Sequence, residues 1–351
     1  MVSIEIGDCR EIMRRWAAEG VKAQTCVTSP PYFGLRDYGH PGQIGLEQTP
    51  EEYIAAMVEV FRCVRDVLAD DGTLWLNIGD SYAGGGGYAP NAPCNQRRAA
   101  GESWGAMNKF RVDQGEARAK ARPGFVPDGC KPKDLIGIPW MLAFALRADG
   151  WYLRQDIIWH KPNPMPESVR DRCTKAHEYI FLMSKSERYY YDAEAIAQPL
   201  AETSKARLAQ PNLANQRGSD RVPGKTNGNM KAVGPRFGGN KYGDDDREES
   251  RTKSGNEWKG GSGEANRRSV WTVATRPYKG AHFATYPPAL IEPCILAGSR
   301  TGDTVLDPFM GSGTTAQVAQ DLGRNAIGCE LNPEYLGLQR ERSAQMGLVF
   351  A

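Results

Sequence analysis

The sequence lacks the features of a membrane-spanning or secreted protein. Its 351 residues contain no apolar run long enough to cross a bilayer, and Met1 to Glu5 do not begin a basic and apolar signal peptide. The eight cysteines are scattered without a Cys-x-x-Cys pair, and the four histidines show no metal-ligand spacing. We therefore expect reduced thiols, a cytoplasmic protein, no membrane partner and no bound metal.

Charge of either sign is nearly balanced overall, at a net +2, but it is unevenly distributed. Residues 97–133 hold nine Lys or Arg against four Asp or Glu, and residues 195–270 hold fourteen against nine. The rest of the chain holds 21 basic and 29 acidic residues, a net charge of −8. Both basic segments are rich in Gly, Asn and Pro. Contact with a polyanion fits this pattern, and so do solvated surface loops.

Alternating strand and helix patterns predict an α/β fold with a parallel sheet. The clearest helix is expected over 50–69, where apolar residues share one face, Thr49 can cap the start and Gly72 follows the end. A hairpin is expected from strands 178–183 and 188–191. The other expected strands are 2–6, 24–27, 73–78, 151–159, 304–306 and 325–329, and the other helices are 9–18, 139–148 and 314–322.

Two segments interrupt these patterns. Residues 83–133 begin with the glycine run 84–87 and contain few large apolar residues, and residues 195–268 are polar with sparse aromatics. We expect a loop insertion at 83–133 and a separate insert at 195–268. The remaining parts, 1–194 and 269–351, then form one domain.

Two short motifs carry the chemistry. Thr28-Ser29-Pro30-Pro31-Tyr32 follows an expected strand and offers a hydroxyl, a rigid carbonyl and an aromatic face. Asp307-Pro308-Phe309-Met310-Gly311-Ser312-Gly313-Thr314-Thr315 follows another strand, and its glycines permit a tight turn with close backbone approach. Glu330 ends the next strand, where it can accept hydrogen bonds from ribose hydroxyls. Taken singly, each loop also fits a plain turn, and the second also fits a nicotinamide-binding loop.

In this order, the two motifs together resemble the beta class of amino-group DNA methyltransferases, of the Ser-Pro-Pro-Tyr type. The resemblance covers residues 1–80, 134–194 and 269–340. It implies a Rossmann-like, S-adenosylmethionine-dependent methyltransferase fold, with a mostly parallel sheet, an antiparallel hairpin and an irregular target-recognition insert at 195–268. Residues 1–194 would form the catalytic half of the domain, and residues 269–351 would form its cofactor-binding half.

The resemblance also implies which residues bind S-adenosylmethionine. The Asp307 loop would hold the amino-acid part of the cofactor, and Asp8 would contact the adenine amino group, unless Asp8 only caps the helix that follows. Phe283 lies in a segment, His282 to Pro287, that resembles the one closing over the methionine end. The expected cofactor-binding residues are Asp8, Thr28, Phe283, Asp307, Pro308, Phe309, Gly311, Ser312, Gly313, Thr314, Thr315 and Glu330.

Ser29, Pro30, Pro31 and Tyr32 are the expected catalytic residues. A nucleobase amino group is a poor nucleophile, and oxygen atoms that accept its hydrogens direct its lone pair at the methyl group, while Tyr32 stacks on an extruded base. Alignment and electrostatics then suffice. Cytosine C5 methylation requires a cysteine nucleophile, and neither Pro93-Cys94 nor Pro293-Cys294 follows a strand.

Within the family, serine at the head of the catalytic motif is typical of cytosine-N4 enzymes, and Asp or Asn of adenine-N6 enzymes. Segments 159–168 and 177–180 resemble the lining of the target-base pocket. We therefore expect site-specific methylation of cytosine N4 in double-stranded DNA by base flipping, by a monomer or homodimer of a bacterial or phage restriction–modification system. Adenine-N6 methylation, RNA or protein methylation, and non-catalytic DNA binding are the alternatives.

Overall fold

The computed structural model describes residues 1–35, 40, 42–84, 126–208, 264–275 and 286–344. The chain divides into two compact units. Unit 1 comprises Met1–Asp192 and Ser269–Ala351, and unit 2 comprises Ala193–Arg268. Most of the expected insertion at 83–133 lies outside the described residues. None of the helices in the described ranges combines the length and apolar character that a membrane crossing requires.

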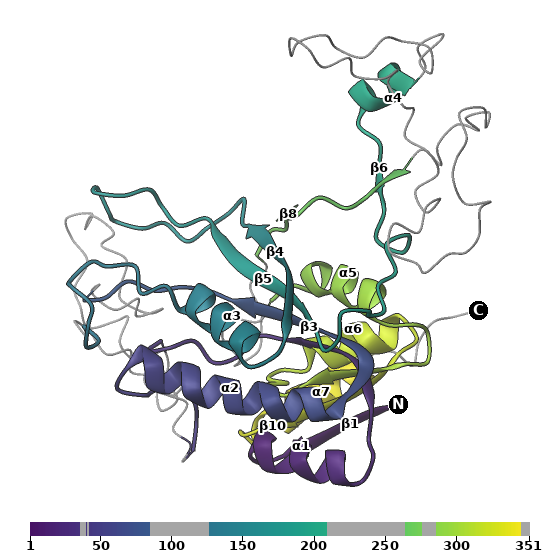
Figure 1. Cartoon of the computed structure of the whole chain (residues 1–351), viewed down its shortest axis with the longest axis horizontal. Helices are drawn as coiled ribbons and strands as arrows, with labels where there is room; N and C mark the ends of the chain where they lie inside the picture. The colour runs from purple at the N-terminus through teal and green to yellow at the C-terminus, as the bar shows by residue number, and fades with distance from the viewer. Residues whose placement is uncertain (36–39, 41, 85–125, 209–263, 276–285, 345–351) are drawn as a thin grey trace, which may run out of the picture. The chain divides into compact units, whose positions relative to one another are not determined.

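Unit 1 is built on an eight-stranded mixed sheet with the order β1-β10-β9-β2-β3-β5-β4-β8 (Figure 1). The first five strands in this order run parallel, β5 is antiparallel to both of its neighbours, and β8 is parallel to β4. The predicted α/β fold with a mostly parallel sheet is confirmed. The strands are β1 (Val2–Ile6), β2 (Ala23–Thr28), β3 (Leu68–Ile78), β4 (Tyr152–His160), β5 (His177–Ser184), β8 (Val270–Thr272), β9 (Thr304–Asp307) and β10 (Asn325–Glu330).

Successive side chains of a strand point to opposite faces of the sheet. Both faces of this sheet are covered by helices (Figure 1). Leu74 and Leu76 of β3 join the main hydrophobic core beneath α1, α2 and α3. Trp75, between them, points the other way and lies against Gly298 of α5. The helices of unit 1 are α1 (Cys9–Ala18), α2 (Pro50–Val67), α3 (Ile138–Ala148), α5 (Pro288–Gly298), α6 (Thr314–Asp321) and α7 (Tyr335–Ala344).

Helix α2 shows how local sequence determines an element. The Thr49 hydroxyl accepts from the Glu52 amide at 3.1 Å, the Glu52 carboxylate accepts from the Thr49 amide at 3.2 Å, and Pro50 occupies the first turn. Its inner face carries Tyr53 and Phe61, both fully buried. Burying each such side chain stabilises the fold by roughly 1.5–3 kcal/mol.

Two sequence predictions about strands are wrong. Strand β3 begins at Leu68, directly after α2, and not at the expected residue 73, so Gly72 follows the end of the helix as expected but lies inside the strand. A Cβ on Gly72 would meet the Ala69 carbonyl at 2.9 Å and the Gln24 carbonyl at 3.1 Å, so glycine permits close backbone approach at this irregularity.

The expected hairpin of 178–183 with 188–191 is the second error. Both hydrogen-bonding edges of β5 are occupied, one by β3 and the other by β4, so no edge is left for a strand at 188–191. That segment packs by its tyrosines instead, with the Tyr191 ring stacked on Trp75 at 6.2 Å between centroids. The antiparallel partner of β5 nearest along the chain is β4, which precedes it.

Unit 2 has little regular structure among its described residues. Strand β6 (Gln198–Pro199) pairs antiparallel with β7 (Glu264–Ala265), and α4 (Glu202–Leu208) follows β6. Residues 209–263, which contain most of the basic side chains of the expected recognition insert, lie outside the described residues.

Candidate active site

The two sequence motifs follow adjacent strands and emerge at one edge of the sheet. Strands β2 and β9 pair in parallel, with Cys26 opposite Leu306, so Thr28 and Asp307 end their strands side by side. Chain connections lead from β2 to β3 on one side and from β9 to β10 on the other. Such a reversal of strand order at the carboxyl edge is where open α/β sheets bind ligands.

A hydrogen-bond network around Asp307 joins the two loops. The Thr28 hydroxyl donates to Oδ1 of Asp307 at 2.7 Å, and the Phe309 amide donates to the same oxygen at 3.0 Å. The Thr315 hydroxyl at 2.5 Å and the Tyr286 hydroxyl at 3.1 Å reach Oδ2. Burial raises the pKa of Asp307, and these hydrogen bonds oppose the rise.

These four donors fill the roughly four acceptor positions of a carboxylate. Asp307 is 1% exposed. Asp307 therefore connects the two loops by hydrogen bonds. Contact of its carboxylate with a cofactor would require one of these four donors to move.

Two side chains form hydrogen bonds with the backbone of the loop after β9. Glu330 Oε2 accepts from the Gly311 amide at 2.7 Å, and Gln339 Nε2 of α7 donates to the Gly311 carbonyl at 2.7 Å. Gly313 has a φ of +85° directly before α6, a conformation that favours glycine. Gly328 of β10 leaves room for the loop, since a Cβ there would approach the Asp307 carbonyl to 2.9 Å.

The same loop fits a ligand with polar groups. The Ser312 side chain is 1% exposed, and within the described ranges its hydroxyl has no hydrogen-bond partner. A buried polar atom without a partner costs about 1–3 kcal/mol, and a bound ligand that offers a hydrogen bond offsets this cost. The unpartnered Ser312 hydroxyl and the glycines beside it thus match a site for the polar end of a cofactor.

Glu330 ends β10 beside this loop, as predicted. Its carboxylate is 8% exposed and also accepts from the Asn332 amide at 2.8 Å. Burial raises the pKa of Glu330, while the backbone hydrogen bonds from Asn332 and Gly311 oppose the rise. The carboxylate is therefore fixed at the carboxyl edge of the sheet.

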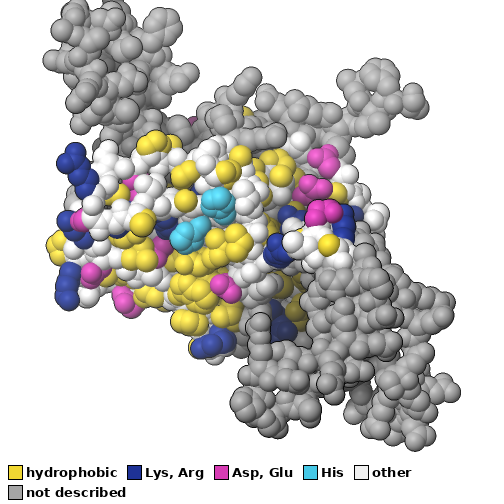
Figure 2. Space-filling model, turned by 90° about the horizontal axis from the view of Figure 1, so that it is seen from above, with side chains coloured by type: hydrophobic (Ala, Val, Ile, Leu, Met, Phe, Trp, Pro, Cys, Tyr) yellow, Lys and Arg dark blue, Asp and Glu magenta, His cyan; other side chains and the backbone are white. Residues whose placement is uncertain are grey.

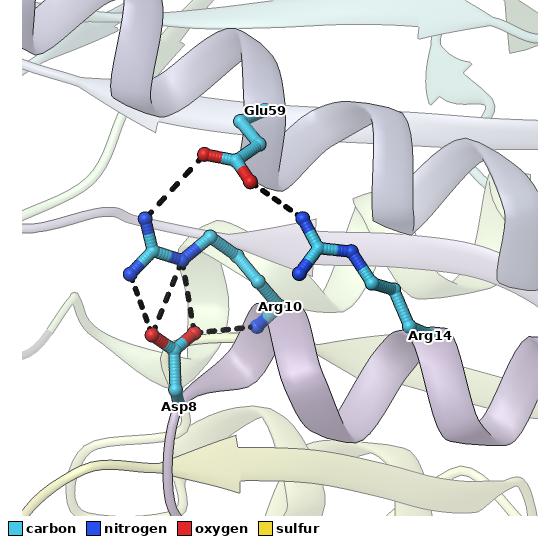
Figure 3. Close-up of polar contacts among 4 residues, drawn as sticks. All are labelled: Asp8, Arg10, Arg14 and Glu59. Atoms are coloured by element: carbon cyan, nitrogen blue, oxygen red, sulfur yellow. Dashed lines mark hydrogen bonds and ion pairs between the residues drawn. The ribbon is translucent and has the colours of Figure 1, made fainter.

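Asp8 lies next along this edge, after β1, and its geometry matches the helix-cap alternative (Figure 3). Its Oδ1 accepts from the Arg10 amide at 2.8 Å at the start of α1. The Arg10 guanidinium binds the same carboxylate, with Nη2 to Oδ2 at 2.5 Å, and lowers the pKa of Asp8. Arg10 also reaches Glu59 of α2, which pairs with Arg14. Contact with a ligand would add to these interactions.

The catalytic loop is rigidly supported. The Tyr53 hydroxyl of α2 donates to the Pro31 carbonyl at 2.8 Å, whereas no residue of the described ranges donates to the Pro30 carbonyl. The Tyr32 hydroxyl donates to Oε2 of Glu178 at 2.9 Å. Burial raises the pKa of Tyr32 well above its usual value, and the Glu178 charge adds to the rise, so the phenol stays protonated.

Glu178 belongs to the antiparallel strand β5, whose first residues reach the edge where the parallel strands end. It pairs with Lys161, just past the end of β4, and lies 3.5 Å from the Asn77 amide nitrogen. A pocket of about 40 Å³ lies beside this group, lined by Tyr32, Phe33, Leu35, Gly79, Asp80, Ser81 and Ile138. Glu178 belongs to the segment at 177–180 that is expected to line a base pocket; it contacts Tyr32 but is not itself in the lining of this pocket.

Several residues of the site carried no usable sequence signal. Gln339, Gly79 and Gly328 act through contacts with segments distant in the sequence. Phe283, which was expected to bind cofactor, lies outside the described residues, although Tyr286 from the same segment reaches Asp307. Among the described residues, no group of three or more His, Cys, Asp and Glu side chains is placed to hold a metal ion.

Comparison with known proteins identifies the family. The DNA methylase family model N6_N4_Mtase matches residues 23–341. The Type II methyltransferase M.SmaI of Serratia marcescens is 43% identical over 342 residues, which cover 97% of this chain and 89% of that protein. The Type II methyltransferase M.Cfr9I of Citrobacter freundii is 43% identical over 337 residues, covering 96% and 85%.

Solved structures share the fold. The PvuII DNA methyltransferase, described as cytosine-N4-specific, superposes with a TM-score of 0.54 at 16% identity, covering 99% of this chain and 88% of that one. The M1.HpyAVI complex with its SAM ligand gives a TM-score of 0.51 at 16% identity, covering 98% and 99%. With the family match over most of its length and the site geometry described above, this chain belongs to the N6_N4_Mtase family of DNA methylases and is a Type II DNA methyltransferase.

Proposed function

We propose that this protein transfers a methyl group from S-adenosylmethionine to the exocyclic N4 of cytosine in a specific duplex DNA sequence. The observation that carries the proposal is the shared sheet edge, where the Ser29–Tyr32 loop and the Asp307–Thr315 loop follow paired strands. Thr28 and Asp307 tie the two loops together at 2.7 Å. A base held by one loop and a methyl donor held by the other would meet between them.

The cofactor half of the site is the loop after β9 with its neighbours on the sheet edge. S-adenosylmethionine supplies an electrophilic methyl group on a positively charged sulfur. The loop backbone and Ser312 would hold the amino-acid part of the cofactor, Glu330 would accept from the ribose hydroxyls, and Asp8 would face the adenine. Thr28, Asp307 and Thr315 would fix the loop, with Pro308, Phe309 and Thr314 forming its walls.

The base half is the loop after β2. An amino group becomes nucleophilic when oxygens accept its hydrogens, and Ser29 and Pro30 offer such oxygens. The Pro31 carbonyl is already used by Tyr53, which favours Pro30 as the backbone acceptor. Tyr32 would stack on the extruded base. Serine at the head of this motif favours cytosine N4 over adenine N6.

Duplex DNA would be read by unit 2 together with residues 83–133. These segments hold the excess of Lys and Arg in the sequence, and such side chains neutralise phosphates and read base edges. On the face shown in Figure 2, apolar side chains gather around histidines and charges of both signs lie toward its ends. We assign most phosphate contacts to the two insertions, where the sequence concentrates its basic side chains.

Mass spectrometry of nucleosides tests the assignment. Duplex DNA treated with the protein and S-adenosylmethionine should contain N4-methylcytosine. N6-methyladenine in its place would correct the target base, and cofactor-independent DNA binding without methylation would favour a non-catalytic protein. Ser29→Ala should reduce turnover while cofactor binding persists, whereas Ser3→Ala, at an exposed position of β1, should leave turnover unchanged. Unchanged turnover in Ser29→Ala would remove Ser29 from the chemistry.

A further inference from the structure

Amino methylation releases a proton, and the structure contains a chain of groups able to receive it. This chain runs from Ser29 through Tyr32 to Glu178 and begins at the atom proposed to accept an amino hydrogen. The inference rests on the proposed function, since it concerns the proton lost from the methylated nitrogen.

The direction of the hydrogen bonds follows from the donor inventory of each group. A tyrosine hydroxyl has a single proton, and Tyr32 donates its proton to the Glu178 carboxylate at 2.9 Å. The Ser29 hydroxyl, in the same loop, acts on the phenol as a hydrogen-bond donor and so opposes the rise in the pKa of Tyr32. In the proposed chain the phenolic oxygen accepts from Ser29. The lone pairs of the Ser29 oxygen are consequently left for an amino hydrogen of the base.

The far end of the chain is the carboxylate of Glu178. Lys161 forms an ion pair with Glu178, and the side chains of both residues are less than one fifth exposed. The Lys161 ammonium in turn lies 4.2 Å from the centroid of the Trp159 ring, which fixes its position. The charged and titratable groups that face Glu178 are Tyr32, Lys161, Lys175 and His177, with the neutral amide of Asn77 beside them.

The absence of a side chain at Gly79 allows Tyr32 and Glu178 to come into contact. A Cβ at Gly79 would lie 2.7 Å from Cε2 of Tyr32 and 3.3 Å from Cδ of Glu178. Both side chains therefore pack directly on the backbone at the end of β3. Because β5 is antiparallel to β3, its second residue, Glu178, lies at the edge where the parallel strands end. A parallel strand would reach this edge only with its last residues.

We propose that Glu178 is the terminal proton acceptor of the methyl transfer. As the N–CH3 bond forms and the S–CH3 bond breaks, the amino nitrogen gains a positive charge and becomes strongly acidic. One of its protons moves to the Ser29 oxygen, the Ser29 proton moves to the Tyr32 oxygen, and the Tyr32 proton moves to Oε2 of Glu178. The product is a neutral methylamino group, and Glu178 becomes a neutral carboxylic acid that later loses the proton to solvent.

Single-turnover methyl transfer measured against pH tests this proposal. Glu178→Gln keeps an oxygen that accepts from Tyr32 but cannot take a proton, so we expect the transfer rate to fall by about 100-fold. Tyr32→Phe keeps the stacking face and interrupts the chain, so it should have a similar effect. In the double variant the two losses should not add, because both changes interrupt one pathway.

Controls separate proton transfer from a structural role. Asp149→Asn makes the same carboxylate-to-amide change in another ion pair, with Arg62 at 2.5 Å at the end of α3, and should leave the rate unchanged. Affinity for S-adenosylmethionine should match the wild type in Glu178→Gln. The wild-type rate should fall at acid pH, and the Gln variant should lose this dependence.

Two outcomes would overturn the proposal. A Glu178→Gln variant that transfers the methyl group at the wild-type rate would exclude Glu178 as acceptor, and so would a variant that retains the acid limb of the pH profile. If the wild-type protein itself transfers no methyl group to a nucleobase amino group, the proposed function fails, which is distinct from an active wild type with equally active variants.

Discussion

Thr28 and Asp307 are 279 residues apart in sequence and joined by a 2.7 Å hydrogen bond at the centre of the sheet edge. The bond connects the first residue before the catalytic loop to the first residue of the cofactor loop. Since Asp307 is buried and accepts hydrogen bonds from residues of both loops, we expect a displacement of either loop to affect the other.

Removal of this bond should weaken both the fold and the reaction. In Thr28→Val the side chain keeps its shape, but one oxygen of a buried carboxylate loses a donor, at a cost of about 1–3 kcal/mol in the free energy of unfolding. Urea denaturation measures this loss, and single-turnover methyl transfer should slow as well. Thr304→Val, at the opposite end of β9, is the matched control. A Thr28→Val protein as stable as the wild type would show that the Thr28–Asp307 hydrogen bond does not contribute to the free energy of unfolding.

The pH dependence of stability should report the buried Glu330. Because burial raises its pKa, the folded state holds this proton more tightly than the unfolded state does. Below the ordinary glutamate pKa of about 4.3, the protonated Glu330 side chain contributes fully to the free energy of unfolding. This contribution is lost as the pH rises through the raised pKa of the folded state. The free energy of unfolding of the wild type, minus that of Glu330→Gln, should therefore fall across this window and then level off.

Asp8 provides a comparison of opposite sign in the same experiment. Its hydrogen bonds to Arg10 lower its pKa, so ionised Asp8 stabilises the fold. The wild type minus Asp8→Asn difference should decline as pH falls through the lowered pKa. Equal slopes for the two variants would contradict the assigned environments.

Gly79→Ala should disturb the base half of the site alone. The new Cβ would lie 2.7 Å from Cε2 of Tyr32, so the ring would have to shift from the position in which its hydroxyl donates to Glu178. A shift of about 1 Å in a positioned group can cost about 100-fold in rate, so we expect a loss of that order in methyl transfer. Cofactor affinity should be retained. Gly337→Ala, on an exposed part of α7 with no atom within 4 Å of the added carbon, is the control. A Gly79→Ala protein of normal activity would argue against the packing described.

Gln339→Leu should instead weaken the cofactor half. Gln339 is 2% exposed, and its amide donates to the Gly311 carbonyl at 2.7 Å. Leucine fills a similar volume without the donor, so the loop loses a support worth about 1 kcal/mol or more. Calorimetric titration with S-adenosylmethionine should show an affinity loss of about tenfold. An unchanged affinity would mean that α7 does not brace the loop.

The sequence allowed most elements of unit 1 to be predicted because their signals are local. Helix α2 has a capping box, Pro50 in its first turn and an apolar face, and each acts within a few residues. Strands ending at Thr28, Asp307 and Glu330 were recognisable because a buried apolar run stops at a polar residue. The pairing of β2 with β9, which brings the two motifs together, has no local signal in the sequence.

The errors arose where a partner strand decides the outcome. Residues 188–191 have the composition of a strand, but β3 and β4 already occupy both edges of β5. The contacts of Tyr286 with Asp307 and of Gln339 with Gly311 join segments whose local sequence gives no sign of each other. The sequence does not distinguish the two roles considered for Asp8. A ligand-binding residue at a strand end and a helix cap both require an aspartate at this position.

The central claim is that the two ends of the chain form one methyl-transfer site. A crystal structure with S-adenosylhomocysteine and a duplex containing the target sequence tests it most directly. The account predicts the cofactor sulfur between the Asp307–Thr315 loop and a flipped cytosine stacked on Tyr32, with its amino group facing Ser29 and Pro30. A cofactor bound away from that loop, or a base extruded on the opposite side of the sheet edge, would contradict it.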